Sequence, residues 1–194
     1  MAVVRVLSHP GAVRPLDSRV PTVDRPLRRN HRFTSVVGMS FIRTTVANGV
    51  GEIILDRPKA LNALDQSMID EMYQTLLTWG DDDAIETVLV TSTHPRAFCA
   101  GGDISEYPAF RFAPDSLRAF HEEDVWGALS AMLTCNCPLV AAIDGHCMGA
   151  GIEIASCCDI RIATIVSRYG APIGKLGFPM APRQWVEQIE KKAA

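Results

Sequence analysis

Two glycine-containing loops carry residue types whose spacing could bind the oxygen of a reacting carbonyl group. The first is Ala97 to Asp103, AFCAGGD, and the second is Asp144 to Gly151, DGHCMGAG. Each follows an apolar, strand-like segment, and ligands of α/β proteins bind where strands end. Glycine lets backbone N–H groups approach a ligand closely, and two such groups aimed at one point stabilise an oxyanion. Taken separately, each loop also fits a turn that only serves packing.

A single carboxylate, Glu153, closely follows the second loop among apolar neighbours. It comes three residues after Ala150, in a segment (GAGIEIAS) that predicts the start of a buried helix. Burial disfavours the charged form of a carboxyl group, so we expect a raised pKa and proton transfer near neutral pH. The alternative is a structural glutamate that is paired with an arginine, such as Arg161 or Arg168.

The segments around these residues predict an α/β protein. Two β-branched runs, Phe41 to Val46 and Val50 to Leu55, are joined by an Asn-Gly turn and predict a hairpin. Asp65 is expected to cap a helix that ends near the aspartates at 81–83. Further elements are expected as strands over 87–91, 139–143 and 160–163, and as helices over 114–133 and from 149. This order predicts right-handed crossovers in a parallel sheet, with the 87–91 strand buried on both faces.

Charge divides the chain into two parts. Residues 1–38 hold seven arginines against two aspartates and are interrupted by four prolines, so we expect a basic, disordered extension. An organelle-targeting peptide and translation from an early start codon are the alternatives. Residues 39–194 hold 12 basic and 20 acidic side chains, which argues against binding to nucleic acid. The apolar segments are too short or too charged to predict a membrane span.

The six cysteines predict no metal site. Cys135 and Cys137 are separated by one residue, Cys157 and Cys158 are adjacent, and neither pair has zinc-ligand spacing. We interpret them as small buried side chains in a reducing compartment, the cytoplasm or, if the extension is a transit peptide, the mitochondrial matrix.

The order of the motifs resembles the enoyl-CoA hydratase/isomerase (crotonase) superfamily. The resemblance runs from about Gly51 to Arg183 and implies a spiral of β-β-α units, with residues 39–194 as an acyl-CoA-binding core. The matching segments are Ile54 to Leu64, Ala97 to Asp103, Pro138 to Gly145, Met148 to Glu153 and Cys158 to Arg161.

The resemblance also implies roles for individual residues. The N–H groups of Gly102 and Ala150 would form the oxyanion hole for a thioester carbonyl, and Glu153 would be the acid and base. No tightly bound cofactor is implied, because coenzyme A enters as part of the substrate. The residues expected to bind its CoA part are Lys59, Ala60, Leu61, Ala100, Gly101 and Asp103, of which Asp103 is also suited to capping its turn.

The implied activity is hydration or isomerisation of a 2-enoyl-CoA through an enolate. Ile173 stands where hydratases of the family place a second glutamate. This departure leaves two alternatives: another family chemistry, such as acyl-CoA thioester hydrolysis, or a CoA-thioester-binding remnant without turnover. The family further implies a homo-oligomer, a trimer or hexamer. The chain is expected to be short of the family's C-terminal helical region.

Overall fold

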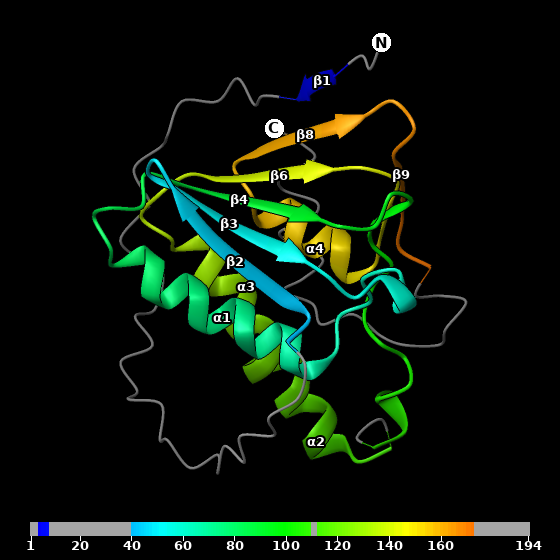
Figure 1. The fold of residues 1–194 in the computed structure, drawn as a ribbon. Helices are drawn as coiled ribbons and strands as arrows, with labels where there is room; N and C mark the ends of the chain where they lie inside the picture. The colour runs from blue at the N-terminus through cyan, green and yellow to red at the C-terminus, as the bar shows by residue number, and fades with distance from the viewer. Residues whose placement is uncertain (1–3, 8–39, 110–111, 173–194) are drawn as a thin grey trace.

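The computed structural model describes residues 4–7, 40–109 and 112–172. In this part of the chain, six strands form one sheet in the order β1-β8-β6-β4-β3-β2, and three short strands form a second sheet, β5-β7-β9. Helices α1, α3 and α4 pack along the larger sheet (Figure 1). The strands are β1 (Val4–Leu7), β2 (Ile42–Ala47), β3 (Val50–Leu55), β4 (Thr87–Ser92), β5 (Ala97–Cys99), β6 (Leu139–Ile143), β7 (His146–Met148), β8 (Ile160–Thr164) and β9 (Arg168–Gly170). The α-helices are α1 (Gln66–Gly80), α2 (Pro114–Ala119), α3 (Trp126–Leu133) and α4 (Ala150–Cys157).

The predicted hairpin is confirmed as β2 and β3, which pair antiparallel from Ile42 opposite Leu55 to Ala47 opposite Val50. Asn48 and Gly49 both have positive φ angles, 52° and 77°. Two consecutive residues in this region form the turn whose twist matches that of paired strands. The Asn-Gly pair therefore fixes the register of the hairpin.

Parallel pairing joins β3, β4, β6 and β8, as the order of the elements predicts. Each connection between these strands carries a helix. Asp65 caps α1 by accepting a 2.9 Å hydrogen bond from the N–H of Met68, which confirms the predicted start of that helix. The predicted helix over 114–133 is continuous, but a π-helical turn at Phe120–Val125 lies between α2 and α3.

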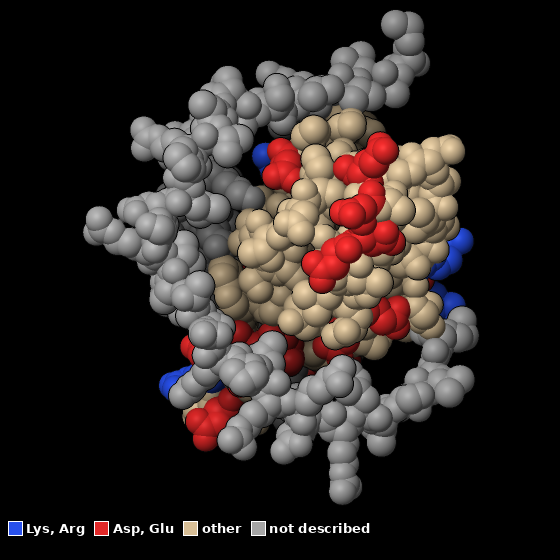
Figure 2. Space-filling view, turned by 90° about the vertical axis from the view of Figure 1, so that its left-hand side faces the viewer, with Lys and Arg blue, Asp and Glu red and all other residues tan. Residues whose placement is uncertain are grey.

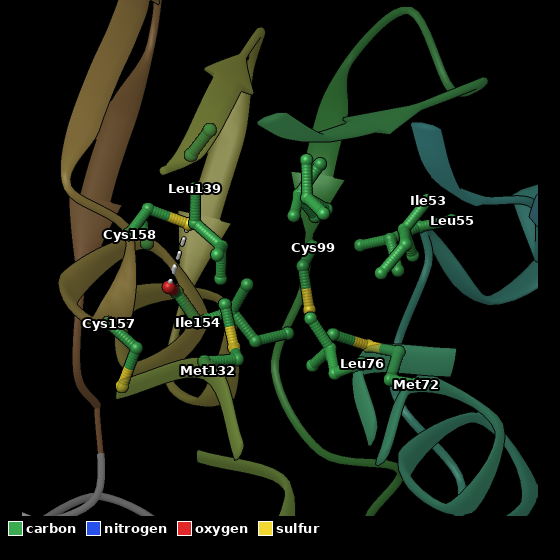
Figure 3. Close-up of a cluster of buried hydrophobic side chains, with 14 of the residues drawn as sticks. Ile53, Leu55, Met72, Leu76, Cys99, Met132, Leu139, Ile154, Cys157 and Cys158 are labelled. Carbon is green, nitrogen blue, oxygen red and sulfur yellow. Dashed lines mark hydrogen bonds between the residues drawn. The ribbon is translucent and has the colours of Figure 1, made fainter. Parts of the chain in front are cut away.

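The core lies between the larger sheet and its helices (Figure 3). In β4, Val88 and Val90 are fully buried, whereas Leu89 and Thr91 are only half-buried. The expectation that this strand is buried on both faces was therefore wrong, because the apolar run packs its alternate side chains against the helices on one face. Cysteines share this core as thiols, and five of them are buried: Cys99, Cys137, Cys147, Cys157 and Cys158.

Four residues of the basic extension form β1, which pairs antiparallel with β8. The backbone of Val4–Leu7 adds a strand at the edge of β8, with Val4 opposite Thr164 and Leu7 opposite Arg161. The disorder that composition predicts for residues 1–38 as a whole stays a prediction. The remaining residues of the extension lie outside the described ranges. Among the described helices, none is long and apolar enough to cross a bilayer. Figure 2 shows one face of the molecule, on which acidic side chains outnumber basic ones.

The second sheet was not predicted. Its three strands contain three residues each, and β5 and β7 come from segments predicted as loops. β7 lies between β5 and β9, with His146 opposite both Ala97 and Arg168. This small sheet holds the two glycine loops in fixed positions, because the loops leave β5 and β7 side by side.

Candidate active site

Backbone hydrogen bonds join the first glycine loop to the segment that follows β3. Ala100 N–H donates to Leu61 O at 3.1 Å, Leu64 N–H to Gly101 O at 2.8 Å, and Asp103 N–H to Leu64 O at 2.7 Å. Leu64 and Gly102 thus form a short parallel bridge. These hydrogen bonds therefore bring together the residues of the two segments that are predicted to bind CoA. Their contact with CoA stays a prediction.

The segment after β3 has an unusual backbone that its side chains stabilise. Leu61 and Asn62 adopt left-handed φ angles of 52° and 56°. Asn62 is fully buried, and its Oδ1 accepts a 2.8 Å hydrogen bond from the N–H of Arg57. Its Nδ2 donates to the carbonyl oxygens of Ala97 and Phe98, both at 3.3 Å. Asn62 thereby fixes the predicted CoA segment against β5.

Lys59 and Ala60, two further residues of the predicted CoA site, lie in a 3-10 turn, Pro58–Ala60, directly before Leu61. The side chain of Lys59 is exposed, and Ala60 is half-buried. An exposed cation on a fixed turn is suited to a phosphate group of a bound ligand. Its contact with CoA stays a prediction.

Arg57 is a positioning residue that sequence reasoning did not single out. Its Nη1 lies 2.7 Å from Asp103 Oδ2, and its Nε lies 3.5 Å from Asp65 Oδ2. Asp103 also accepts hydrogen bonds from the N–H and hydroxyl of Ser105 at 2.9 Å and 2.6 Å. These hydroxyl and guanidinium contacts hold the pKa of Asp103 below its usual value. The capping role predicted for Asp103 is thus confirmed, and its carboxylate is engaged by protein groups.

The two glycine loops touch through their backbones. Gly101 and Gly149 have positive φ angles of 114° and 50°, which favour glycine. A Cβ on Gly149 would lie 3.5 Å from the Cα of Gly101, and one on Gly101 would lie 3.4 Å from the carbonyl oxygen of Met148. The residues that follow, Gly102 and Ala150, are therefore neighbours in space although 48 positions separate them.

The N–H groups predicted to form the oxyanion hole belong to these two neighbours. Ala150 is the first residue of α4, so its N–H has no acceptor within the helix. Within the described ranges, no group accepts a hydrogen bond from the N–H of Ala150 or Gly102. The positive end of the helix dipole lies at the same point and favours an anion there. The pair fits the predicted role, and their convergence on one oxygen stays a prediction.

Glu153 lies in the first turn of α4. Burial raises the pKa of its carboxyl group from 4.5 to about 7. No described residue forms an ion pair or hydrogen bond with this carboxylate. The alternative pairing with Arg161 is not observed, because that guanidinium donates instead to the carbonyl oxygens of Ala155 and Cys158. A half-buried carboxyl group with a pKa near 7 can both accept and return a proton at neutral pH.

Tyr107 is a second residue of the site that sequence reasoning missed. Its hydroxyl oxygen would lie 2.6 Å from a Cβ on Gly102. Burial raises its pKa, and the nearby charge of Glu153 raises it further. The sequence around Tyr107 gives no signal for this position, which depends on how the following turn folds back.

Ile173, the departure at the second-glutamate position, lies outside the described residues.

Comparison with known proteins finds relatives whose names describe reactions of CoA thioesters. A sequence model of the family described as Enoyl-CoA hydratase/isomerase matches residues 45–194. The chain is 38% identical over 128 residues to "Probable enoyl-CoA hydratase echA8" of Mycobacterium tuberculosis, covering 66% of this chain and 48% of that protein. It is 34% identical over 132 residues to "3-hydroxyisobutyryl-CoA hydrolase, mitochondrial" of Gallus gallus, covering 68% of this chain and 34% of that protein. The chain thus spans half or less of the length of these relatives.

Solved structures share the same fold. The structure of an enoyl-CoA hydratase/carnithine racemase from Magnetospirillum magneticum superposes with a TM-score of 0.73 at 30% identity, covering 77% of this chain and 56% of that one. This similarity confirms the predicted crotonase-like α/β fold. The family match extends over most of the chain and includes both glycine loops and Glu153. We conclude that the chain belongs to the enoyl-CoA hydratase/isomerase family.

Proposed function

We propose that the chain acts on acyl-CoA thioesters and hydrates, or isomerises, a 2-enoyl-CoA through an enolate. One observation carries the proposal: Glu153, with a pKa of about 7, lies one turn from the point where the loop backbones of Gly101 and Gly149 touch. Enolate chemistry requires a group that exchanges protons near neutral pH and donors that stabilise the enolate oxygen. A carboxyl group with a pKa near 7 and two N–H groups without a protein acceptor can fill these two roles.

In hydration, the thioester oxygen accepts hydrogen bonds from the N–H groups of Gly102 and Ala150. Glu153 takes a proton from water while the water oxygen bonds to C3 of the substrate. The electrons of the double bond move to C2 and onto the thioester oxygen, which gives an enolate. Glu153 then returns its proton to C2, so the net change is addition of one water molecule. Each N–H donor is expected to contribute roughly 3–4 kcal/mol to stabilising the enolate.

Isomerisation would form a dienolate in the same oxyanion hole, without added water. Glu153 would remove a proton from one carbon beside the double bond and return it two carbons away. In both reactions, the CoA part would lie along the bridged segments that include Leu61, Ala100 and Asp103. The exposed Lys59 would meet its phosphates.

The direct test follows the absorbance of crotonyl-CoA, whose conjugated chromophore disappears on hydration. We expect the full chain to consume it and Glu153→Gln to slow the reaction by about 10²-fold or more. Glu86→Gln is the matched control, because this exposed glutamate lies at the start of β4, before the strand rather than after it. An inactive wild-type chain with a cooperative unfolding transition, or an active Glu153→Gln, would contradict the proposal.

Thioester hydrolysis is the second candidate function, favoured by the 34% identity with a 3-hydroxyisobutyryl-CoA hydrolase. In that reaction the oxyanion hole would stabilise a tetrahedral intermediate instead of an enolate. A thiol reagent separates the two functions, because hydrolysis releases free CoA and hydration does not. The predicted assembly into a homo-oligomer stays a proposal, which light scattering of the purified chain would test.

A further inference from the structure

The hydroxyl group of Tyr107 lies against Gly102, one of the two residues predicted to form the oxyanion hole. This residue opens a short 3-10 turn, Tyr107–Ala109, that follows the first glycine loop. Because its oxygen lies 2.6 Å from the position of a Cβ on Gly102, the phenol packs directly against the Cα of that glycine. Its ring meets Phe120 edge-to-face, with centroids 6.4 Å apart. This aromatic contact restricts the ring and holds the hydroxyl in place.

Three carboxylates raise the pKa of Tyr107, and they differ in their hydrogen-bond and ion-pair partners. Glu153, Asp103 and Glu106 all raise its pKa, after burial as the largest cause. Asp103 is engaged by Arg57 and Ser105, and Glu106 accepts a 2.9 Å hydrogen bond from the N–H of Gln66. The carboxylate of Glu153 has no such partner among the described residues. The phenol therefore lies within electrostatic reach of a carboxylate that no described residue engages.

Hydration requires that the added water molecule be oriented toward C3, and one hydrogen bond to Glu153 does not fix that orientation. The added water molecule has two protons, of which Glu153 accepts one. The second must be held by another acceptor if the water oxygen is to point at C3. A phenol with a raised pKa keeps its own proton at neutral pH, but its oxygen still accepts a hydrogen bond.

We propose that Tyr107 binds the water molecule that is added to the substrate, with its phenol oxygen accepting a hydrogen bond from that water. This role rests on the proposed hydratase function. The water passes one proton to Glu153 and keeps the other, directed at Tyr107, as its oxygen bonds to C3. The electrons move onto the thioester oxygen, and Glu153 protonates C2. Tyr107 gains and loses no proton, so the reaction balances as simple addition of water.

The test compares hydration with a reaction that needs the enolate but no added water. Exchange of the C2 hydrogens of butyryl-CoA with deuterium oxide, measured by mass spectrometry, requires only Glu153 and the oxyanion hole. For Tyr107→Phe we expect kcat for crotonyl-CoA hydration to fall about 10-fold or more, since the water loses its orientation. KM and the exchange rate should stay within about 2-fold of wild type, because neither depends on a positioned water.

Two controls complete the experiment. Tyr73→Phe removes a hydroxyl from α1, a helix that holds none of the predicted site residues, and should leave both reactions unchanged. Urea unfolding of each variant checks that the fold is retained. Unchanged hydration by Tyr107→Phe, or an equal loss of hydration and exchange, would overturn the role of Tyr107. A wild-type chain that catalyses neither reaction would overturn the proposed function, and this role with it.

Discussion

Arg57 and Asp103 form an ion pair, 2.7 Å between Nη1 and Oδ2, that joins the segment after β3 to the first glycine loop. Both side chains are largely buried, at 19% and 13% exposure. Arg57 donates in addition to the carbonyl oxygen of Ala63 at 3.0 Å and lies over the ring of Phe41. This one guanidinium thus orients both segments predicted to hold CoA.

Asp103→Asn should therefore destabilise the chain by about 1–2 kcal/mol at pH 7, because the largely buried Arg57 guanidinium loses its anionic partner. The folded-state pKa of Asp103 is below 3.8, so its contribution is complete above that pH and fades as pH falls through the lower value. Urea unfolding at pH 7 and pH 3 measures both effects. Asp83→Asn, at an exposed position, is the control. Equal stability of Asp103→Asn and wild type at pH 7 would refute the prediction.

The hydration rate should depend on the charge of Glu153. Its pKa of about 7 means that half the molecules carry the basic form at that pH. Because the ionised form accepts the proton of water, kcat/KM should rise about tenfold per pH unit below 7 and level off above it. Initial rates between pH 5 and 9 test this. A rate that is flat across pH 7 would exclude Glu153 as the base.

Stability should show the opposite dependence on pH. The pKa of Glu153 is raised from 4.5 to about 7 by burial, so ionisation costs more in the folded state than in the unfolded one. Wild type should lose stability relative to Glu153→Gln as pH rises from 4.5 to 7, by up to about 3 kcal/mol, and lose no more above 7. Parallel urea titrations at pH 4.5, 6 and 8 provide the comparison. A constant difference between the two proteins would contradict the burial of this carboxyl group.

Gly102 and Tyr107 should be coupled in stability. A Cβ on Gly102 would lie 2.6 Å from the phenol oxygen but 3.6 Å from Cζ, which is an ordinary contact. Gly102→Ala should therefore cost about 1–3 kcal/mol in the wild-type background. It should cost clearly less in the Tyr107→Phe background, where the oxygen is absent. A double-mutant cycle measures the difference, and equal costs would show that the oxygen does not lie there.

Close packing of α4 on β5 should make the stability of the chain sensitive to substitution of Gly151. A Cβ at this position would lie 2.8 Å from the Cβ of Cys99 and 3.0 Å from its carbonyl oxygen. Gly151→Ala should lower stability by about 1–3 kcal/mol, because backbone must move to admit the methyl group. Gly127→Ala is the matched control, since nothing lies within 4 Å of its Cβ in α3. That substitution should stabilise the chain by about 0.5–1 kcal/mol. Thermal or urea unfolding shows whether Gly151→Ala lowers the free energy of unfolding and Gly127→Ala raises it.

Local sequence determined the main elements of this fold. The Asn48-Gly49 turn, the Asp65 cap and the apolar runs each depend on a few neighbouring residues. They can therefore be predicted without knowledge of tertiary contacts. The order of the motifs likewise determined the family and drew attention to Gly102, Ala150 and Glu153. Periodicity did not show that β4 is buried on one face, because an apolar run is the same whether helices cover one face or two.

Only the tertiary structure decided how these residues meet. The strands of the second sheet are too short to show a period, and β5 meets β7 across a long sequence separation, as does Gly101 with Gly149. The ion pair of Arg57 and the position of Tyr107 depend on the same long-range folding. The pKa of Glu153 depends on desolvation by all the elements packed around α4. Such burial is a property of the assembled fold, which no local run of residues specifies.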